Sequence, residues 1–238
     1  MFVIRRMLHL VCVGPEPPSE RAWHCEESWR KCNPQWNLVW WCDEHVEPAF
    51  SILSRKLPDG SPDLVVVLRA IYEQASSIEQ RSDILRLVML FLYGGASIDP
   101  EVESHFPLEP QLEPWLEGHA AFVAFCSGSD AGLALRGLAP AAEAMLIGAT
   151  RQNPFIGFCL QNLPSWFQQR QGEAAEPTAL IRTGPSFILE MLRAWNQIEH
   201  DQDDTAVALL PDGFLLRPLC QDARRCNLTP QDSMPSLW

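Results

Sequence analysis

The chain has 238 residues, 47% of them hydrophobic, which is enough for one substantial α/β domain or two small ones. Its formal net charge of −12 argues against nucleic acid or an anionic membrane surface as a general partner. No apolar stretch reaches the length that a bilayer-spanning helix needs, so the sequence predicts no transmembrane segment.

The first 74 residues alternate between strand-like and helix-like patterns. Met7–Gly14 is predicted to be the first strand, not part of a signal peptide, because its apolar run is short and ends in Gly-Pro. On this strand we expect His9 to be a core histidine, with a catalytic role as the alternative. A helix at Glu20–Lys31, capped by Ser19, and a strand at Trp36–Cys42 then complete a predicted parallel βαβ unit. Two more helices are predicted, at Glu47–Lys56 and Asp63–Gln74.

The stretch from Arg81 to Glu103 predicts a buried helix followed by a short strand. Almost every residue in Ile84–Leu92 is apolar, which is typical of a helix that is buried nearly all round. Gly94 and Gly95 are expected to end this helix, because glycine adopts the left-handed cap conformation without a Cβ clash. A short strand is then predicted at Ala96–Ile98.

Two carboxylates follow this strand, Asp99 and Glu101, on either side of Pro100. Proline cannot continue a strand ladder, so both carboxylates should lie where the strand leaves the sheet. There they can turn toward one hard divalent cation, Mg²⁺ or Mn²⁺, that keeps positions open for phosphates. The alternative is a chance D-x-E pair without function.

On the predicted helix, Asp83 and Arg86 are three residues apart and therefore share one face. They can supply a hydroxyl acceptor and a phosphate or hydroxyl donor next to such a cation. The alternative is an ordinary ion pair on a helix face.

The second half of the chain continues with strands and helices. A proline-rich connection is expected at His105–Pro114. Thr183-Gly184-Pro185 is expected to be a structural turn and helix cap, with anion-binding amides as the alternative. The predicted elements are strands at Ala120–Cys126 and Glu143–Ala149, helices at Pro154–Gln169 and Ser186–Glu199, and a hairpin at Val207–Pro218.

The eight cysteines form no C-x-x-C pair, and no pair of histidines completes a zinc-finger spacing. We expect reduced thiols, with disulfides as the alternative if the protein is secretory, Cys220 and Cys226 being the closest pair. The location is left open between the cytoplasm and, if an anchor is missing, the Golgi lumen.

Three motifs in the central stretch carry a family resemblance. Ser82-Asp83-Ile84-Leu85-Arg86, Tyr93-Gly94-Gly95 and Asp99-Pro100-Glu101 resemble the sugar-donor motif of the DXD glycosyltransferases of family 32 and of the glucosyltransferase domains of large clostridial toxins. The first 43 residues resemble the same family at Leu8-His9, Gly14, Pro17-Pro18, Ser28-Trp29, Asn33-Pro34 and Trp41-Cys42-Asp43.

The resemblance implies a GT-A-like α/β fold with a mostly parallel central sheet flanked by helices. It implies one glycosyltransferase domain over residues 1–238, with 1–104 as the nucleotide-sugar-binding half and 105–238 as the acceptor-side half. It also implies metal-assisted transfer of a hexose, with retention, from a UDP- or GDP-hexose to a hydroxyl of a glycan, lipid or protein.

The resemblance assigns roles to single residues. Asp99 and Glu101 would hold Mn²⁺ or Mg²⁺, with Ser236 near the metal. Asp83 and Arg86 would contact the sugar, the ribose or the diphosphate. Nucleotide-sugar binding would further involve Val11, Cys12, Val13 and Trp238.

Three positions depart from the family pattern, and all three were expected to face the donor. Cys12 replaces a tryptophan that stacks on the base in toxin relatives, Ser97 stands where tyrosine is common, and Glu101 replaces an aspartate. The alternative function is therefore a catalytically decayed GT-A-like protein that serves as a binding or scaffold module.

Overall fold

The computed structural model describes residues 4–57, 62–116, 118–126, 144–169, 183–198 and 206–210. In chain order its elements are β1 (Met7–Val11), α1 (Glu20–Cys32), β2 (Asn37–Trp41), α2 (Asp43–Leu53), α3 (Pro62–Gln74), α4 (Ile78–Tyr93), β3 (Gly95–Ile98), α5 (Leu108–Leu116), β4 (Ala121–Cys126), β5 (Ala144–Ala149), α7 (Pro154–Gln169), α9 (Pro185–Trp195) and β6 (Val207–Leu209). No helix within these ranges has the length and apolarity to cross a membrane.

The strands form one six-stranded sheet in the order β2-β1-β3-β5-β4-β6. β1 pairs in parallel with β2 and β3, and β4 pairs in parallel with β6, whereas β5 runs antiparallel to both of its neighbours. Five of the six strands therefore point the same way. The predicted mostly parallel sheet with flanking helices is confirmed.

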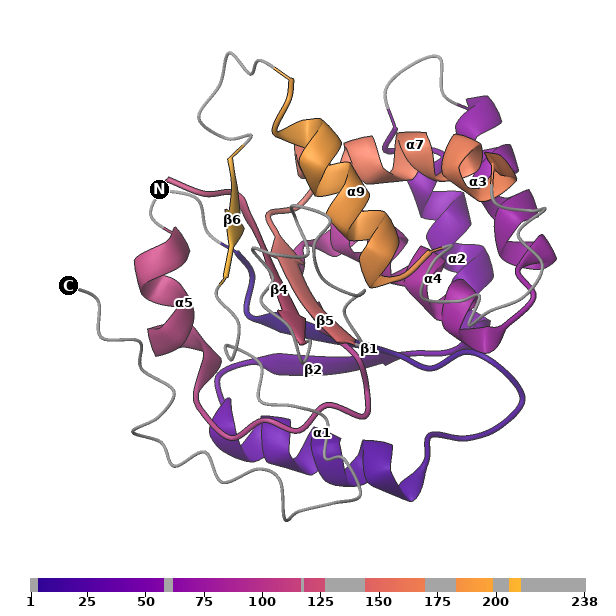
Figure 1. The fold of residues 1–238 in the computed structure, drawn as a ribbon. Helices are drawn as coiled ribbons and strands as arrows, with labels where there is room; N and C mark the ends of the chain where they lie inside the picture. The colour runs from indigo at the N-terminus through magenta and orange to yellow at the C-terminus, as the bar shows by residue number, and fades with distance from the viewer. Residues whose placement is uncertain are drawn as a thin grey trace.

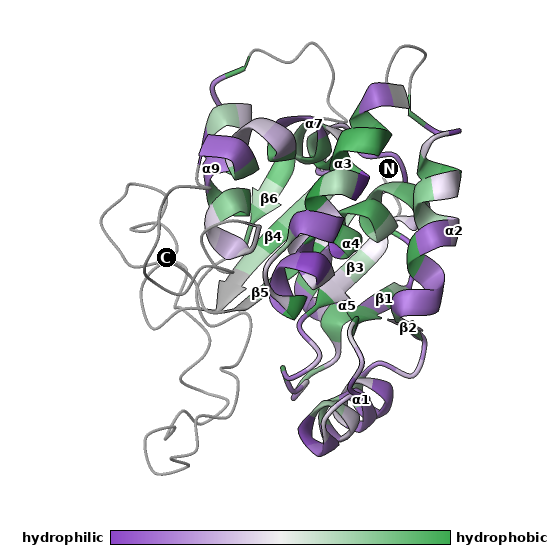
Figure 2. Ribbon diagram, turned by 90° about the vertical axis from the view of Figure 1, so that its right-hand side faces the viewer, coloured by the Kyte–Doolittle hydropathy of each residue, from purple (hydrophilic) through white to green (hydrophobic). Residues whose placement is uncertain are grey.

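Helices cover both faces of this sheet, α1 and α5 on one face and α2, α3, α4, α7 and α9 on the other (Figure 1). Successive side chains of a strand point to opposite faces, so each strand serves both cores. Leu8 and Leu10 pack with Trp29 of α1, while Val11 packs in the core that contains α4. In Figure 2 the strands β4 and β6 are mostly hydrophobic, and the outer turns of α1 are hydrophilic.

The helix α4 lies at the centre of the larger core, and every residue from Ile84 to Leu92 is buried, as predicted. Its N-cap is Ser77, whose Oγ accepts a hydrogen bond from Gln80 N, and its C-cap is Gly94, where φ is +66°. The chain then turns straight into β3. As a result, α4 runs back along the sheet and its first turns lie at the carboxyl ends of the parallel strands.

The predictions for α2 and for the segment that contains α5 were wrong. α2 begins at Asp43, four residues before the predicted start, because His45 Nδ1 accepts a hydrogen bond from Cys42 N and caps the helix earlier. The proline-rich connection after Glu103 contains the helix α5. Pro110 fits into its first turn, where no amide donor is needed, and Asn33 Oδ1 accepts a hydrogen bond from Leu108 N at 2.6 Å.

The predicted hairpin is described only in part. Val207–Leu209 forms a strand, β6, whose pairing within the described sheet is parallel to β4. The predicted turn at Pro211-Asp212-Gly213 and the second arm lie outside the described residues, as do Cys220 and Cys226. The described thiols that are free are those of Cys12, Cys25, Cys32, Cys42 and Cys159.

Candidate functional site

The carboxyl ends of β1, β2 and β3 meet at one edge of the sheet because these three strands are parallel. Two hydrogen bonds tie together the loops that leave this edge. Gly14 N donates to Asp43 Oδ2 at 2.9 Å, and Ser19 Oγ donates to Glu101 Oε1 at 3.0 Å. This edge of an open α/β sheet is where ligands bind in such folds.

A buried cluster lies at the start of α4. Arg86 Nη1 donates to Asp83 Oδ1 at 2.9 Å, and the two side chains are 6% and 12% exposed. Thr183 Oγ1 donates to Asp83 Oδ2 at 3.1 Å, so both oxygens of this carboxylate are hydrogen-bonded. The ion pair that was considered as the alternative is present, but it is almost completely desolvated, unlike an ordinary exposed pair on a helix face.

Thr183 is the member of this cluster that the sequence did not reveal. It is 2% exposed and directly precedes Gly184, the N-cap of α9. The turn expected at Thr183-Gly184-Pro185 is present, and it also delivers a hydroxyl to a carboxylate 100 residues away in the chain. No local pattern predicts a contact at that separation.

The charge state of Asp83 is set by its surroundings. Burial raises the pKa of Asp83 from 3.8 to about 6. This value is the net result: burial is the largest cause, and the Arg86 guanidinium and the hydrogen bond from Thr183 act against it by favouring the charged form. The negative charge of Asp99 raises the pKa, so the first predicted metal ligand lies within electrostatic reach of Asp83.

Arg86 retains a donor for another group. Its Nε atom is buried and has no hydrogen-bond partner within the described ranges. A buried guanidinium N–H without an acceptor is costly, so such an atom indicates a missing polar partner.

The predicted acidic pair leaves β3 as a tight turn. Asp99 Oδ1 accepts a hydrogen bond from Glu101 N at 3.0 Å, which holds the Asp99 carboxylate against the backbone of the turn after β3. Glu101 is exposed, and one of its oxygens accepts from Ser19. Each carboxylate keeps one oxygen, Asp99 Oδ2 and Glu101 Oε2, without a hydrogen bond from any described residue.

The predicted base-binding segment follows β1. Val11 and Val13 are each 2% exposed, so their side chains belong to the core, while Cys12 between them is half-buried. Cys12 N donates to Trp41 O at 2.9 Å, which extends the β1–β2 pairing by one bond. Burial, then the nearby Cys42 and Asp43, raises the pKa of the Cys12 thiol. Ser236 and Trp238 lie outside the described residues.

His9 is a core histidine, as predicted. It is fully buried, and its pKa is lowered to about 4 by burial. Trp41 Nε1 donates to His9 Nδ1 at 2.9 Å, so Nε2 carries the proton and donates to Gly94 O at 2.7 Å. Trp41 also stacks on Tyr93, with ring centroids 5.3 Å apart. Trp41 thus contacts both His9 and Tyr93 in the core, and each of the three belongs to a different motif of the family resemblance.

Ser97 has a structural partner as well. It is fully buried on β3, and its Oγ donates to His9 O on the neighbouring strand at 3.1 Å. This hydrogen bond joins β3 to β1, and the buried side chain exposes no surface to a ligand. Because its side chain is buried, the expectation that Ser97 faces the donor is wrong.

Comparison with known proteins agrees with this arrangement. Residues 19–118 match the family model of the glycosyltransferase sugar-binding region containing the DXD motif. A solved structure titled "PaToxG Glycosyltransferase" is 20% identical with a TM-score of 0.52, over 82% of this chain and 69% of that one. The UDP-bound glycosyltransferase domain from the YGT toxin is 12% identical with a TM-score of 0.55, over 90% of this chain and 81% of that one. No curated protein matches the sequence significantly.

The matched region contains Asp83, Arg86, Asp99 and Glu101, and the two structures share the fold of this chain. The predicted resemblance is confirmed. The chain has a GT-A-like α/β fold, and its residues 19–118 match the sugar-binding region of the DXD glycosyltransferases.

Proposed function

We propose that this domain transfers a hexose from a nucleotide-sugar donor to a hydroxyl of a glycan, lipid or protein, with retention of configuration. The supporting observation is the buried Asp83, held by Arg86 and Thr183 and within electrostatic reach of Asp99. These groups gather at the carboxyl edge of the sheet, inside the region matched by the family model. The UDP bound to a structure of similar fold favours a UDP-hexose over a GDP-hexose as the donor.

Asp99 and Glu101 would hold a divalent cation, Mn²⁺ or Mg²⁺. The donor set fits this role, because each carboxylate keeps one oxygen without a described partner and hard cations prefer oxygen ligands. When bound, such an ion neutralises a diphosphate and takes up negative charge on the leaving group. Ser236 is expected to lie near the same ion.

Arg86 and Asp83 would orient the donor. The partnerless Nε of Arg86 can donate to a sugar or diphosphate oxygen, in a buried setting where a charge-assisted bond is strong. Asp83 accepts one hydrogen bond at each oxygen, and each oxygen has a second lone pair for a ribose or sugar hydroxyl. Thr183 would hold the carboxylate in place for this contact.

The nucleotide base would lie against residues 11–13. Because the side chains of Val11 and Val13 are buried, the groups left for the base are the backbone and the Cys12 side chain. Trp238 would close over the diphosphate. In this arrangement residues 1–104 bind the donor and residues 105–238 supply the acceptor side.

In the transfer step the bond from the sugar C1 to the leaving phosphate breaks, and a bond from C1 to the acceptor oxygen forms. The leaving phosphate takes the proton of the acceptor hydroxyl. No separate general base is therefore assigned among the residues of this chain.

A donor panel tests the proposal. UDP- and GDP-hexoses are incubated with the protein and Mn²⁺ or with a chelator, and released nucleoside diphosphate is measured. At least one donor should be turned over in a metal-dependent manner, and Asp99→Asn should lower the rate on the order of 100-fold, by removing a charge that faces the leaving group. Asp63→Asn, an exposed aspartate on α3, is the matched control and should keep the rate. Retention is read from the anomeric signal of the product.

The second candidate is a decayed domain that binds or scaffolds without transfer. The observation that favours it is Cys12, which offers far less surface to a base than an indole does. If no donor of the panel is bound or turned over, the scaffold function is favoured over the enzyme.

A further inference from the structure

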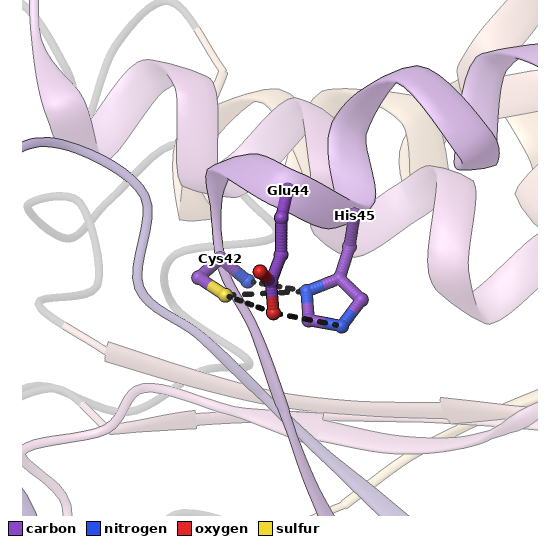
Figure 3. Close-up of side chains that lie close together, drawn as sticks. All are labelled: Cys42, Glu44 and His45. Atoms are coloured by element: carbon purple, nitrogen blue, oxygen red, sulfur yellow. Dashed lines mark hydrogen bonds and ion pairs between the residues drawn. The ribbon is translucent and has the colours of Figure 1, made fainter.

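A cluster of three metal-ligating side chains lies at the start of α2 (Figure 3). Cys42 Sγ is 3.2 Å from His45 Nδ1 and 3.7 Å from Glu44 Oε1, and His45 Nε2 is 3.9 Å from Glu44 Oε1. Within the described ranges, it is the one group of three or more such side chains whose ligand atoms lie together, all within 4.8 Å.

These separations suit one tetrahedral transition-metal ion. A zinc ion lies about 2.3 Å from sulfur and about 2.0–2.1 Å from nitrogen or oxygen, which places its ligand atoms roughly 3.4–3.6 Å apart. The separations of Cys42 Sγ from His45 Nδ1 (3.2 Å) and from Glu44 Oε1 (3.7 Å) lie within a few tenths of an ångström of that range, and the three ligand atoms all lie within 4.8 Å of one another. A modest rotation of the Glu44 and His45 side chains would therefore bring the three groups to one ion.

The chemistry of the set also favours a borderline cation over a hard one. A thiolate and an imidazole select zinc, cobalt and related ions, whereas magnesium and calcium prefer all-oxygen sites. A thiolate and a carboxylate together balance the charge of a divalent ion. The cluster is reachable from solvent, since the side chains of Glu44 and His45 are 78% and 36% exposed.

Helix capping explains only part of the arrangement. Cys42 N donates to His45 Nδ1 at 3.1 Å, which is a capping contact at the start of α2. It accounts for the position of the imidazole, while a separate contact, in which the Cys42 thiol donates to Glu44 Oε1 at 3.7 Å, holds the carboxylate beside the thiol. Neutral imidazole has one lone pair, so metal coordination would replace this backbone bond.

We propose that Cys42, Glu44 and His45 bind a borderline divalent transition-metal ion, Zn²⁺ in the first place. The fourth position is filled by water or by Cys12. Cys12 follows β1 as Cys42 follows β2, and Val11 and Trp41 just before them are register partners in the parallel sheet. The site is separate from the Asp99 and Glu101 site and does not rest on the proposed transfer activity.

Cobalt is the probe for this site. The full chain, treated with a chelator that is then removed, is titrated with Co²⁺ and observed in the near ultraviolet, where thiolate-to-cobalt charge transfer absorbs. We expect one equivalent to give this band and Zn²⁺ to displace it. Cys42→Ser should abolish the band, and serine is a good N-cap, so α2 should remain folded.

Two further variants keep the helix cap and remove a ligand. His45→Gln can still accept from Cys42 N, as glutamine does at this position of a capping box, but lacks the imidazole. His45→Gln and Glu44→Gln should each weaken Co²⁺ binding by about tenfold or more, the least that loss of a supporting group costs. Cys12→Ser then distinguishes a thiol from water in the fourth position.

The controls separate this site from other thiols and from the donor site. Cys32→Ser removes a half-buried free thiol, and Asp99→Asn removes the donor-site carboxylate; both should keep the band. No band in the wild type, a band that survives in Cys42→Ser, or a band lost in Asp99→Asn would each overturn the proposal. Nucleotide sugars are absent throughout, so the result is independent of transfer activity.

Discussion

Asp83 is the residue whose environment does most to define the proposed donor site. Burial favours the protonated form of its carboxyl group, whereas Arg86 and Thr183 favour the carboxylate. With a pKa of about 6, the group ionises just below neutral pH. If it accepts hydroxyls as a carboxylate, kcat/KM should fall as the pH drops through about 6.

Thr183→Val tests this assignment. The hydrogen bond from Thr183 lowers the pKa of Asp83, so its loss should raise that pKa. The acid limb of the kcat/KM profile should then move upward by about one pH unit, since a bond to a charged group contributes about 1.5 kcal/mol or more. Thr183→Ser keeps a hydroxyl and should restore the limb. An unmoved limb in the valine variant would show that Asp83 does not govern the profile.

His9 makes the free energy of unfolding rise with pH, whereas Asp83 makes it fall. Its pKa of about 4 in the fold lies below the ordinary 6.5, so the unfolded chain binds the proton more readily. The stability that neutral His9 contributes is full above pH 6.5 and is lost as the pH falls toward 4. Asp83 acts in the other direction, because its raised pKa makes stability fall as the pH rises from 3.8 to about 6.

A comparison with His9→Gln isolates the histidine, because both proteins retain Asp83. At pH 7 the variant should lose roughly 1–3 kcal/mol of unfolding free energy, since partners of the buried ring are left unsatisfied. The difference should narrow as the pH falls toward 4, which urea denaturation at several pH values can follow. A constant difference would contradict the assigned protonation, and His24→Gln, an exposed histidine on α1, should cost within about 0.5 kcal/mol.

At the scale of elements, the turn from α4 into β3 depends on two glycines, Gly94 and Gly95, which both have positive φ and no room for a Cβ. Gly95 has φ of +99°, and a Cβ there would lie 2.5 Å from Met7 O on β1. Gly118 also has positive φ, +77°, but a Cβ there would meet nothing within 4 Å.

Gly95→Ala should therefore cost more than Gly118→Ala. Gly118→Ala should lower the free energy of unfolding by about 1 kcal/mol, from backbone strain alone. Gly95→Ala should lower it by about 3 kcal/mol or more, because β1 and β3 must also move apart. Urea denaturation of both variants measures the difference. Equal losses would mean that the close approach of the two strands does not constrain this glycine.

The predicted elements show what local pattern can and cannot specify. The apolar run of α4 and its glycine stop have local causes, so their positions were predicted within a few residues. The helix α5 was missed because its prolines indicate a loop unless one knows that Pro110 lies in the first turn. Its cap comes from Asn33, which is 75 residues away in the sequence.

Local sequence patterns also predicted some residues of the candidate site and missed others. Asp83 and Arg86, three apart on one helix, were predicted to share one face, and their side chains do meet there in an ion pair. Thr183 was not predicted to join them, because that contact depends on how α9 packs against the rest of the fold. The Cys42, Glu44 and His45 cluster was also missed, since zinc-finger spacings describe ligands on separate segments and these three share one helix start.

For the whole molecule, the parallel half of the sheet determines where the chemistry lies. Three strands end at one edge, and α4 returns to that edge with Asp83 and Arg86 in its first turns. Helix α9, from the other end of the chain, adds Thr183. We propose that a divalent ion held by Asp99 and Glu101 anchors a nucleoside diphosphate at this edge.

Calorimetric titration with UDP, in the presence and absence of Mn²⁺, shows whether the ion is needed for diphosphate binding. Wild-type protein should bind UDP at least about tenfold more tightly with Mn²⁺, and Asp99→Asn and Glu101→Gln should each remove most of this difference, because the ion then loses a charged ligand. The Asp63→Asn control should keep it. UDP affinity that is the same with and without Mn²⁺ in the wild type would contradict the account.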